Sequence, residues 1–283
     1  MGAVVAVATA LVAGLLSGCG SSSGASVTAP AVAPAQTYRL GSFQPSGTIA
    51  PGRPTTMSFD VKLPDGTTLT RYKTGSGPHT GVHLIIVRDD LAHIIHEHPP
   101  ISPTGILRQK VTFPAPGPYR VLVDVYPDIP GGQPNFQLSR NVTVRGAYHP
   151  TGLPAFRAHQ VVDGIHFDMA SHQKIHAIQA VFLHVNVTDA HGRPVRFTPW
   201  FGALAHAIFF QNGALNYFHT HVCAPAAPNC GSIGGTRTVS GRSTAPGKLT
   251  IGVLLPVPGT WRLFVQLKVH GRVVTAPFTL NVA

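Results

Sequence analysis

Short apolar runs separated by turn-forming residues recur along the chain, and this pattern predicts β-strands rather than helices. Residues 57–63 and 180–187 alternate apolar and polar side chains, and each run leads into a turn-like segment. Further apolar runs at residues 119–125, 261–269 and 273–282 also fit strands. No long stretch has the periodicity of an amphipathic helix. We therefore expect an all-β protein.

The clearest single element is a predicted β-hairpin at residues 204–222, LAHAIFFQNGALNYFHTHV. Its central Asn-Gly pair stands between two apolar runs, and both residue types tolerate the positive φ of a two-residue type I′ turn. Folding the chain about that pair places His206 opposite His219. Because strand side chains alternate between faces, His221 points the same way as His219. The pattern predicts three imidazoles on one face of one hairpin.

The same stretch occurs earlier in the chain, without a gap. Residues 81–99, GVHLIIVRDDLAHIIHEHP, align with it residue for residue, although Asp-Asp replaces the Asn-Gly pair. Three histidines recur in matching positions: His83 with His206, His96 with His219, and His98 with His221. A second pair of blocks follows in the same order, TFPAPGPYRVLVDV at 112–125 and LLPVPGTWRLFVQL at 254–267. Two ordered pairs of blocks indicate an internal duplication.

The duplication and the length of 283 residues predict two tandem domains. We place the first repeat at residues 37–146, a Gly- and Pro-rich linker at 147–154, and the second repeat at 155–283. Each repeat is expected to hold about seven short strands, which is typical of an Ig-like β-sandwich. The 30 glycines and 26 prolines agree with a fold of many turns.

The first 36 residues predict export. Residues 1–18 form an apolar leader that ends Leu-Ser-Gly before Cys19, and this ending resembles the bacterial lipobox. The resemblance implies a lipid such as palmitate on Cys19, and anchorage on the extracytoplasmic face of the cell membrane. No Lys or Arg precedes the apolar run, unlike an ordinary signal peptide, and an uncleaved membrane helix is the alternative. Residues 19–36, without charge and rich in Ser, Gly, Ala and Pro, predict a flexible tether.

The formal net charge of +11 is spread along the chain. It favours attraction to an anionic membrane or wall surface, and no dense basic run or recognition helix indicates a nucleic-acid partner. Glu97 is the one glutamate of the sequence, and several aspartates stand in turn-like contexts. This scarcity disfavours a hydrolase that uses paired carboxylates, and no Gly-x-Ser-x-Gly elbow is present. We expect a protein that is not an enzyme.

The recurring histidines are candidate metal ligands, because neutral imidazole suits zinc, copper and nickel. Cross-strand Cβ atoms lie about 4.5–5.5 Å apart, so imidazoles on such a frame can meet one ion. The chain has three methionines, which disfavours a thioether-rich Cu(I) site and leaves Cu(II) or Zn(II). The predicted ligands are His83, His96, His98, His206, His219 and His221.

The metal assignment of the histidines and the role of Asp124 each leave an alternative open. Duplication copies packing residues as well as ligands, so the histidine rows also fit a metal-free Ig-like interaction or scaffold protein. Asp124, which aligns with Gln266, is either a hydrogen-bond acceptor for an imidazole or a structural residue. Whether the two repeats form one site or two is likewise open.

Cys223 and Cys230 are the cysteines left after the lipidation site. In an exported chain an even remainder predicts a disulfide between them. The alternative is metal ligation, because Cys223 shares its strand parity with His219 and His221.

The block His-x12-His-x-His, followed by Pro-x-Pro-Gly-x-[Tyr/Trp]-Arg and a strand, resembles exported β-sandwich domains of the YtkA-like kind. The resemblance covers the central part of each repeat, and it implies metal association at the six histidines, with copper ahead of zinc. The second repeat departs from the first by having Val222 in place of Pro99 and by its cysteine loop. A cupin enzyme also carries His-x-His, but it needs a glutamate a few residues later, which neither pair has.

The sequence therefore predicts an extracytoplasmic, lipid-anchored metal-binding protein that stores, delivers or senses metal. Its expected contacts are the membrane, through the lipid, and a metal-handling protein that the sequence does not identify.

Overall fold

The computed structural model describes residues 37–169, 174–224 and 241–283. The leader, Cys19 and the tether, together with Cys230, lie outside these residues. The described residues fold into β-strands and connecting loops, with no α-helix among them, so the expected all-β class is confirmed. No helix in this part of the chain has the length and apolar character needed to cross a membrane. Residues Thr37–Ala283 form one compact unit.

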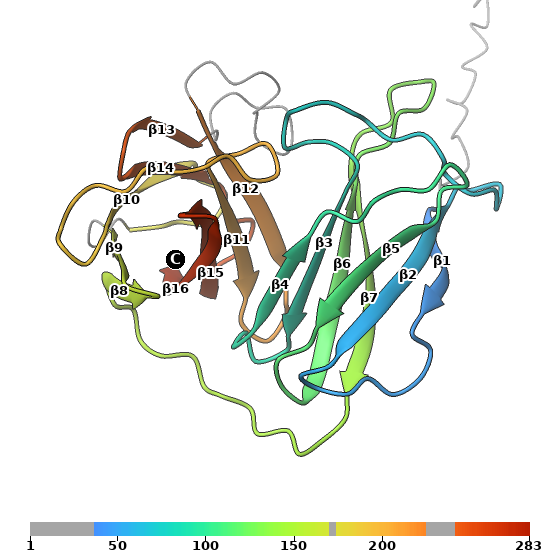
Figure 1. Ribbon diagram of the computed structural model, residues 1–283, viewed down its shortest axis with the longest axis horizontal. Helices are drawn as coiled ribbons and strands as arrows, with labels where there is room; N and C mark the ends of the chain where they lie inside the picture. The colour runs from blue at the N-terminus through green and yellow to red at the C-terminus, as the bar shows by residue number, and fades with distance from the viewer. Residues whose placement is uncertain (1–36, 170–173, 225–240) are drawn as a thin grey trace, which may run out of the picture. The chain divides into compact units, whose positions relative to one another are not determined.

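The first repeat is a sandwich of two antiparallel sheets (Figure 1). The three-stranded sheet has the order β1 (Arg39–Gln44), β2 (Pro54–Lys62), β5 (Leu107–Thr112). The four-stranded sheet has the order β4 (Ile94–Glu97), β3 (Val82–Arg88), β6 (Gly117–Val125), β7 (Phe136–Val144). Their inner faces share one apolar core, in which Met57 and Phe59 meet Val121 and Val123. Alternation of apolar residues along each strand produces this face.

The second repeat has nine strands, where about seven were expected, and they form one continuous sheet. Its order is β16 (Arg272–Val282), β15 (Gly259–Val269), β11 (Ala205–Gln211), β12 (Tyr217–Cys223), β13 (Gly241–Ala245), β14 (Lys248–Val253), β10 (Val181–Thr188), β9 (Ile165–Met169) and β8 (His159–Val162). The short parallel pairing of β12 with β13 joins the two halves. Leu183 and Val185 from one half pack with Leu263 and Val265 from the other.

Two matching aromatic residues anchor the two cores, as the repeated block predicts. Tyr119 and Trp261 are both fully buried. Each ring donates a hydrogen bond to a backbone carbonyl four residues earlier: the Tyr119 hydroxyl to Ala115 at 2.9 Å, and the Trp261 indole N–H to Val257 at 3.2 Å. Satisfying the polar end allows a large ring to be buried at no net hydrogen-bond cost.

A third apolar cluster joins the two repeats. Every residue of β3 is buried, and alternate side chains serve different clusters. Leu84 and Ile86 lie in the core of the first repeat, whereas Ile85 packs with Ile208 and Phe264 of the second. The outer face of the four-stranded sheet is therefore covered by β11 and β15.

The predicted hairpin register is wrong by two residues. His206 pairs with His221, and Ile208 pairs with His219, so the loop runs over residues 212–215 instead of two residues. Gly213 takes a positive φ of 82°, but the second positive φ, 55°, falls at Leu215. Leu215 is buried in the cluster between the repeats, and this burial outweighs the local preference for a two-residue turn. A shift of two preserves side-chain parity, so the three imidazoles still share one face.

Candidate metal centre

All six predicted ligands gather in one cluster where the two repeats pack. We define the histidine cluster as His79, His83, His96, His98, His206, His219 and His221. The rings form a continuous set of contacts, with His83 stacked on His98 at 4.1 Å between centroids and His219 against His221 at 4.4 Å. Contacts between histidines of the two repeats are only slightly longer, for example 4.7 Å from His79 to His221 and 4.9 Å from His96 to His206. The repeats therefore contribute to one site.

Strand alternation places these side chains. On β3, His83 has the same parity as Ile85, which faces the second repeat. On β11, His206 has the same parity as Ile208, which faces the first repeat. Each hairpin therefore has one outer face that serves two purposes. Near the turn this face holds the apolar cluster between the repeats, and at the opposite end it holds the histidines.

Backbone carbonyls of two loops set the protonation of two rings. His83 Nε2 lies 2.7 Å from the carbonyl oxygen of Pro78, and His206 Nε2 lies 3.0 Å from that of Trp200. A carbonyl oxygen only accepts, so each Nε2 carries the proton and donates it. The Nδ1 atom of each ring is therefore unprotonated, and it faces His219.

Gln266 sets the protonation of a third ring, from the opposite repeat. Its Oε1 accepts from His96 Nδ1 at 3.1 Å, and its amide nitrogen donates to Thr275 Oγ1 at 3.0 Å. His96 Nε2 is thus left unprotonated. The aligned residue Asp124 has its Oδ2 3.6 Å from His219 Nδ1, and that oxygen accepts from the Tyr217 hydroxyl at 2.7 Å. Both members of this aligned pair adjoin the cluster.

His219 is the centre of the arrangement. Its Nδ1 lies 3.3 Å from His83 Nδ1, and its Nε2 lies 3.3 Å from His206 Nδ1. A neutral imidazole has one N–H, so it donates to only one of these two unprotonated nitrogens. At the other contact two lone pairs face each other, an arrangement that a cation would relieve.

Several buried polar atoms of the histidine cluster and of the adjoining Asp124 lack a hydrogen-bond partner among the residues that the structure describes. They are His96 Nε2, His98 Nε2, His221 Nε2 and Asp124 Oδ1. An unsatisfied buried polar atom costs about 1–3 kcal/mol, and native structures hold few of them. These four atoms can each accept a hydrogen bond from a buried water molecule or, for the imidazole nitrogens, bind a metal ion.

Burial holds the imidazoles in the neutral form that binds metals. It lowers the pKa of His206 to about 4, and burial together with the His206 charge lowers the pKa of His98 to about 3. Burial and neighbouring histidine charges hold the pKa of His219 well below its ordinary value. Burial raises the pKa of Asp124 to about 7, against the lowering effect of the Tyr217 hydrogen bond.

Two triads have the geometry to hold an ion. The ligand atoms of His83, His96 and His219 lie within 4.8 Å of one another, and so do those of His206, His219 and His221. His98 belongs to neither triad, but it borders the first one and stacks on Phe201 at 3.8 Å. Cys223 belongs to neither triad in the part of the chain searched, so its role as a ligand is not supported.

Sequence patterns did not identify three of the residues at this site. His79 Nε2 lies 3.1 Å from His221 Nδ1, and Trp200 and Phe201 pack against the rings of His96 and His98. All three lie in loops outside the duplicated blocks, so no matching position marks them. The predicted disulfide stays a prediction, because Cys223 lies at the end of β12 but Cys230 is not described.

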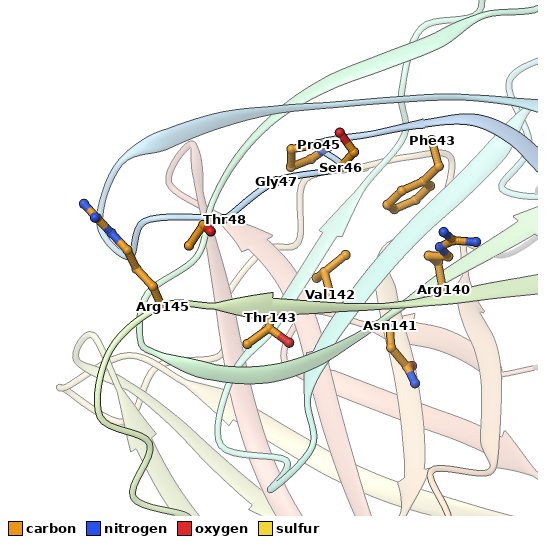
Figure 2. Close-up of a pocket in the computed structure, with 10 residues that line it drawn as sticks. All are labelled: Phe43, Pro45, Ser46, Gly47, Thr48, Arg140, Asn141, Val142, Thr143 and Arg145. Atoms are coloured by element: carbon orange, nitrogen blue, oxygen red, sulfur yellow. The ribbon is translucent and has the colours of Figure 1, made fainter.

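A separate hollow of about 500 Å³ lies on the first repeat (Figure 2). Phe43, Arg140 and Arg145 are among its lining residues, which include neither histidine nor carboxylate. It therefore does not contribute to the histidine cluster.

A family model described as a domain of unknown function, DUF8832, matches residues 38–139 and 160–283. The search of curated proteins finds no match. Among solved structures, a Salmonella alpha-2-macroglobulin reacted with methylamine is 14% identical, with a TM-score of 0.28, over 87% of this chain and 14% of that one. A tetra-tandem repeat from a large adhesion protein is 11% identical (TM-score 0.27) over 88% of this chain and 50% of that one. Invasin, a bacterial integrin-binding protein, is 16% identical (TM-score 0.23) over 88% and 39%. The chain thus spans half or less of the length of each of these proteins.

Proposed function

The chain belongs to the DUF8832 family, and from its histidine cluster we propose that it binds Cu(II) or Zn(II) as a lipid-anchored metal-handling protein outside the cytoplasm. The observation that carries the proposal is the convergence of unprotonated nitrogens. His83, His206 and His96 each have one ring nitrogen engaged with a carbonyl-type acceptor and leave the other for the cluster. A ligating histidine typically has such an outer hydrogen bond, which fixes its tautomer.

The nitrogen spacing supports a tetrahedral ion. Two ligands on such an ion, with bonds of about 2.0–2.1 Å, are separated by about 3.3–3.4 Å. One nitrogen pair in each triad has this spacing: His83 with His219, and His206 with His219, are both 3.3 Å apart. This spacing favours Zn(II), whereas the YtkA-like resemblance favours copper. A square-planar Cu(II) ion would need these pairs to close to about 2.9 Å, so both ions belong in the test.

Burial of the triads supports storage or delivery of metal over catalysis. All members of the two triads are buried, and a catalytic zinc site keeps one position open to water or substrate. Trp200 and Phe201 also contact the rings of His96 and His206.

The lipobox-like ending of the leader supports a location at the cell membrane, with residues 19–36 as the tether. A flexible chain of this length has a mean reach of roughly 20–25 Å, and the net charge of +11 favours an anionic surface. If Cys19 carries the anchor, the Cys19→Ala chain moves from the membrane fraction to the soluble fraction. An unchanged membrane fraction contradicts the anchor.

Metal titration tests the binding itself. The chain beginning after Gly24 keeps the whole compact unit, and it is titrated with Cu(II) and with Zn(II) by calorimetry. We expect His219→Gln to weaken binding at least tenfold, because His219 belongs to both triads. His191→Gln changes an exposed histidine in a turn and serves as the matched control.

Equal affinity of the His219→Gln chain and the unchanged chain for both ions contradicts the proposal. A chain in which His96, His98, His219 and His221 are all changed to Ala extends the comparison. If the chain binds neither ion, the alternative function is that of a metal-free Ig-like interaction or scaffold protein.

A further inference from the structure

His219 is shared by the two triads, and its two ring nitrogens face different partners. Nδ1 faces His83 of the first triad, and Nε2 faces His206 of the second, both at 3.3 Å. The two nitrogens of an imidazole point away from each other, so a single ion contacts only one of them. Each ring nitrogen of His219 thus lies beside the metal-ligating nitrogens of a different triad.

One ion leaves part of the cluster unsatisfied. With an ion held by His83, His96 and His219, the buried Nε2 of His221 still has no partner among the described residues. With an ion in the second triad, the same holds for Nε2 of His96. Two ions, one in each triad, place a cation beside both of these rings, whereas the Nε2 atom of His98, which belongs to neither triad, stays without a partner among the described residues.

His96 of the first repeat, which aligns with His219, does not have both ring nitrogens available. Gln266 accepts the Nδ1 proton of His96 at 3.1 Å, so His96 offers only Nε2. At His219 the aligned residue is Asp124, whose Oδ2 is 3.6 Å from Nδ1 and accepts a hydrogen bond from Tyr217. At 3.6 Å this contact is longer than a hydrogen bond, so the Nδ1 atom of His219 is not engaged in the way that Gln266 engages His96 Nδ1, and the Gln266–Asp124 difference favours His219 as the shared ligand.

We infer that the histidine cluster holds two divalent transition-metal ions, with His219 bridging them as an imidazolate; this inference rests on the proposed function. One ion is bound by His83, His96 and Nδ1 of His219, and the other by His206, His221 and Nε2 of His219. Loading releases one proton to solvent, the ring proton of His219, as two metal–nitrogen bonds form on that ring. The buried carboxyl group of Asp124 adds negative charge beside the first ion when ionised.

Two measurements on the metal-free chain beginning after Gly24 test the bridge. Equilibrium dialysis with elemental analysis gives the number of ions per chain, which we expect to be two. Low-temperature electron paramagnetic resonance follows Cu(II) loading. We expect the mononuclear signal to grow up to one equivalent and to fall as the second ion enters, because an imidazolate couples the two unpaired spins antiferromagnetically.

Variants separate the two positions. His206→Gln and His221→Gln each remove a ligand of the second ion only, so both should bind one Cu(II) ion with a full mononuclear signal. His191→Gln should keep two ions and the coupled signal. Circular dichroism checks that each variant is folded. If a variant fails to fold, the ion count and the resonance titration of the unchanged chain still test the bridge.

The outcomes distinguish the inference from the proposed function. One tightly bound ion per chain, or two ions whose signal accounts for two uncoupled spins, overturns the bridge and leaves metal binding intact. Binding no tighter than that of the His219→Gln chain overturns both.

Discussion

At the scale of single residues, the chemistry of this site depends on which ring nitrogen carries the proton. Pro78 and Gln266 decide it for His83 and His96 by accepting from opposite nitrogens, Nε2 in one ring and Nδ1 in the other. The unprotonated atom therefore differs between two histidines of the same hairpin. Sequence spacing does not contain this information, because neither acceptor lies in the same strand as the ring it orients.

The metal-free protein should lose stability as the pH falls from about 6.5 towards 4. The pKa of His206 is lowered to about 4 in the folded chain, so between these values the unfolded chain binds a proton that the folded chain does not. Each such histidine contributes up to about 1.4 kcal/mol of lost stability per pH unit. Asp124, whose pKa is raised to about 7, acts in the opposite direction between pH 3.8 and 7 and offsets about one histidine.

Urea unfolding at pH 7.5, 6 and 5 measures this dependence. His206→Gln removes one titrating group and should flatten the slope, whereas His191→Gln should not. Stability that is constant from pH 7.5 to 5 contradicts the expectation.

Gln266→Met should weaken metal binding about 10- to 100-fold. Methionine keeps the length of the side chain but cannot accept the His96 proton, so the ring loses its fixed orientation. Calorimetric titration with Zn(II) measures the change. Gln109→Met, in strand β5 of the three-stranded sheet, is the control and should leave the affinity unchanged; equal affinities of the two variants count against an orienting role for Gln266.

At the scale of elements, hairpins supply the histidines and loops complete the site. The strand faces follow from alternation, which is why the three predicted imidazoles of each hairpin share a face. The loops depend on longer-range contacts. Gly202, beside Phe201, has a φ of 75°, and its backbone lies directly against residues 76–78 of the other repeat.

Gly202→Ala should destabilise the protein by about 1–3 kcal/mol and weaken metal binding. An added Cβ would lie 2.6 Å from the Gly77 carbonyl carbon and 2.7 Å from the Pro78 nitrogen, so the loop that orients His83 must move. Gly213→Ala is a matched control, because its φ is 82° but nothing lies within 4 Å of the added atom.

Urea unfolding and Zn(II) titration of both variants separate the clash from the backbone strain. We expect Gly213→Ala to cost only the strain and to bind Zn(II) normally. If the two variants behave alike, contact between the loops does not hold the site.

At the scale of the whole molecule, the two repeats share a site and an apolar cluster. Ile85 of the first repeat packs in the same cluster as Ile208 and Phe264 of the second, and the first triad takes His219 from the second repeat. Residues Thr37–Ala283 accordingly form one compact unit. Separation of the repeats would expose this cluster and divide the triad.

Zn(II) should raise the thermal midpoint, with the two repeats unfolding in a single transition. A ligand that binds only the folded chain stabilises it by about 2.7 kcal/mol at 100 times its dissociation constant. Differential scanning calorimetry with and without Zn(II) measures the shift. His219→Gln should show little or no shift, and two separate transitions in the unchanged, loaded chain would contradict a shared site.

The sequence by itself determined the β-class, the duplication and the face on which the histidines lie. Period-two alternation and matching blocks are local properties of the sequence, and they hold even where a turn is predicted wrongly. The predicted register of the second hairpin was wrong by two residues, but His206, His219 and His221 still lie on one face. The aligned aromatics Tyr119 and Trp261 likewise occupy equivalent buried positions.

Only the tertiary structure decided that both histidine sets meet, and which nitrogen of each ring faces inward. The outer sheet faces of the two repeats pack together because burying residues such as Ile85 and Phe264 lowers the free energy of the folded chain. This gain is a sum over residues that are distant in the sequence. The acceptors Pro78, Trp200 and Gln266 come from loops and from an opposing strand. Their positions follow from packing, so no local pattern records them.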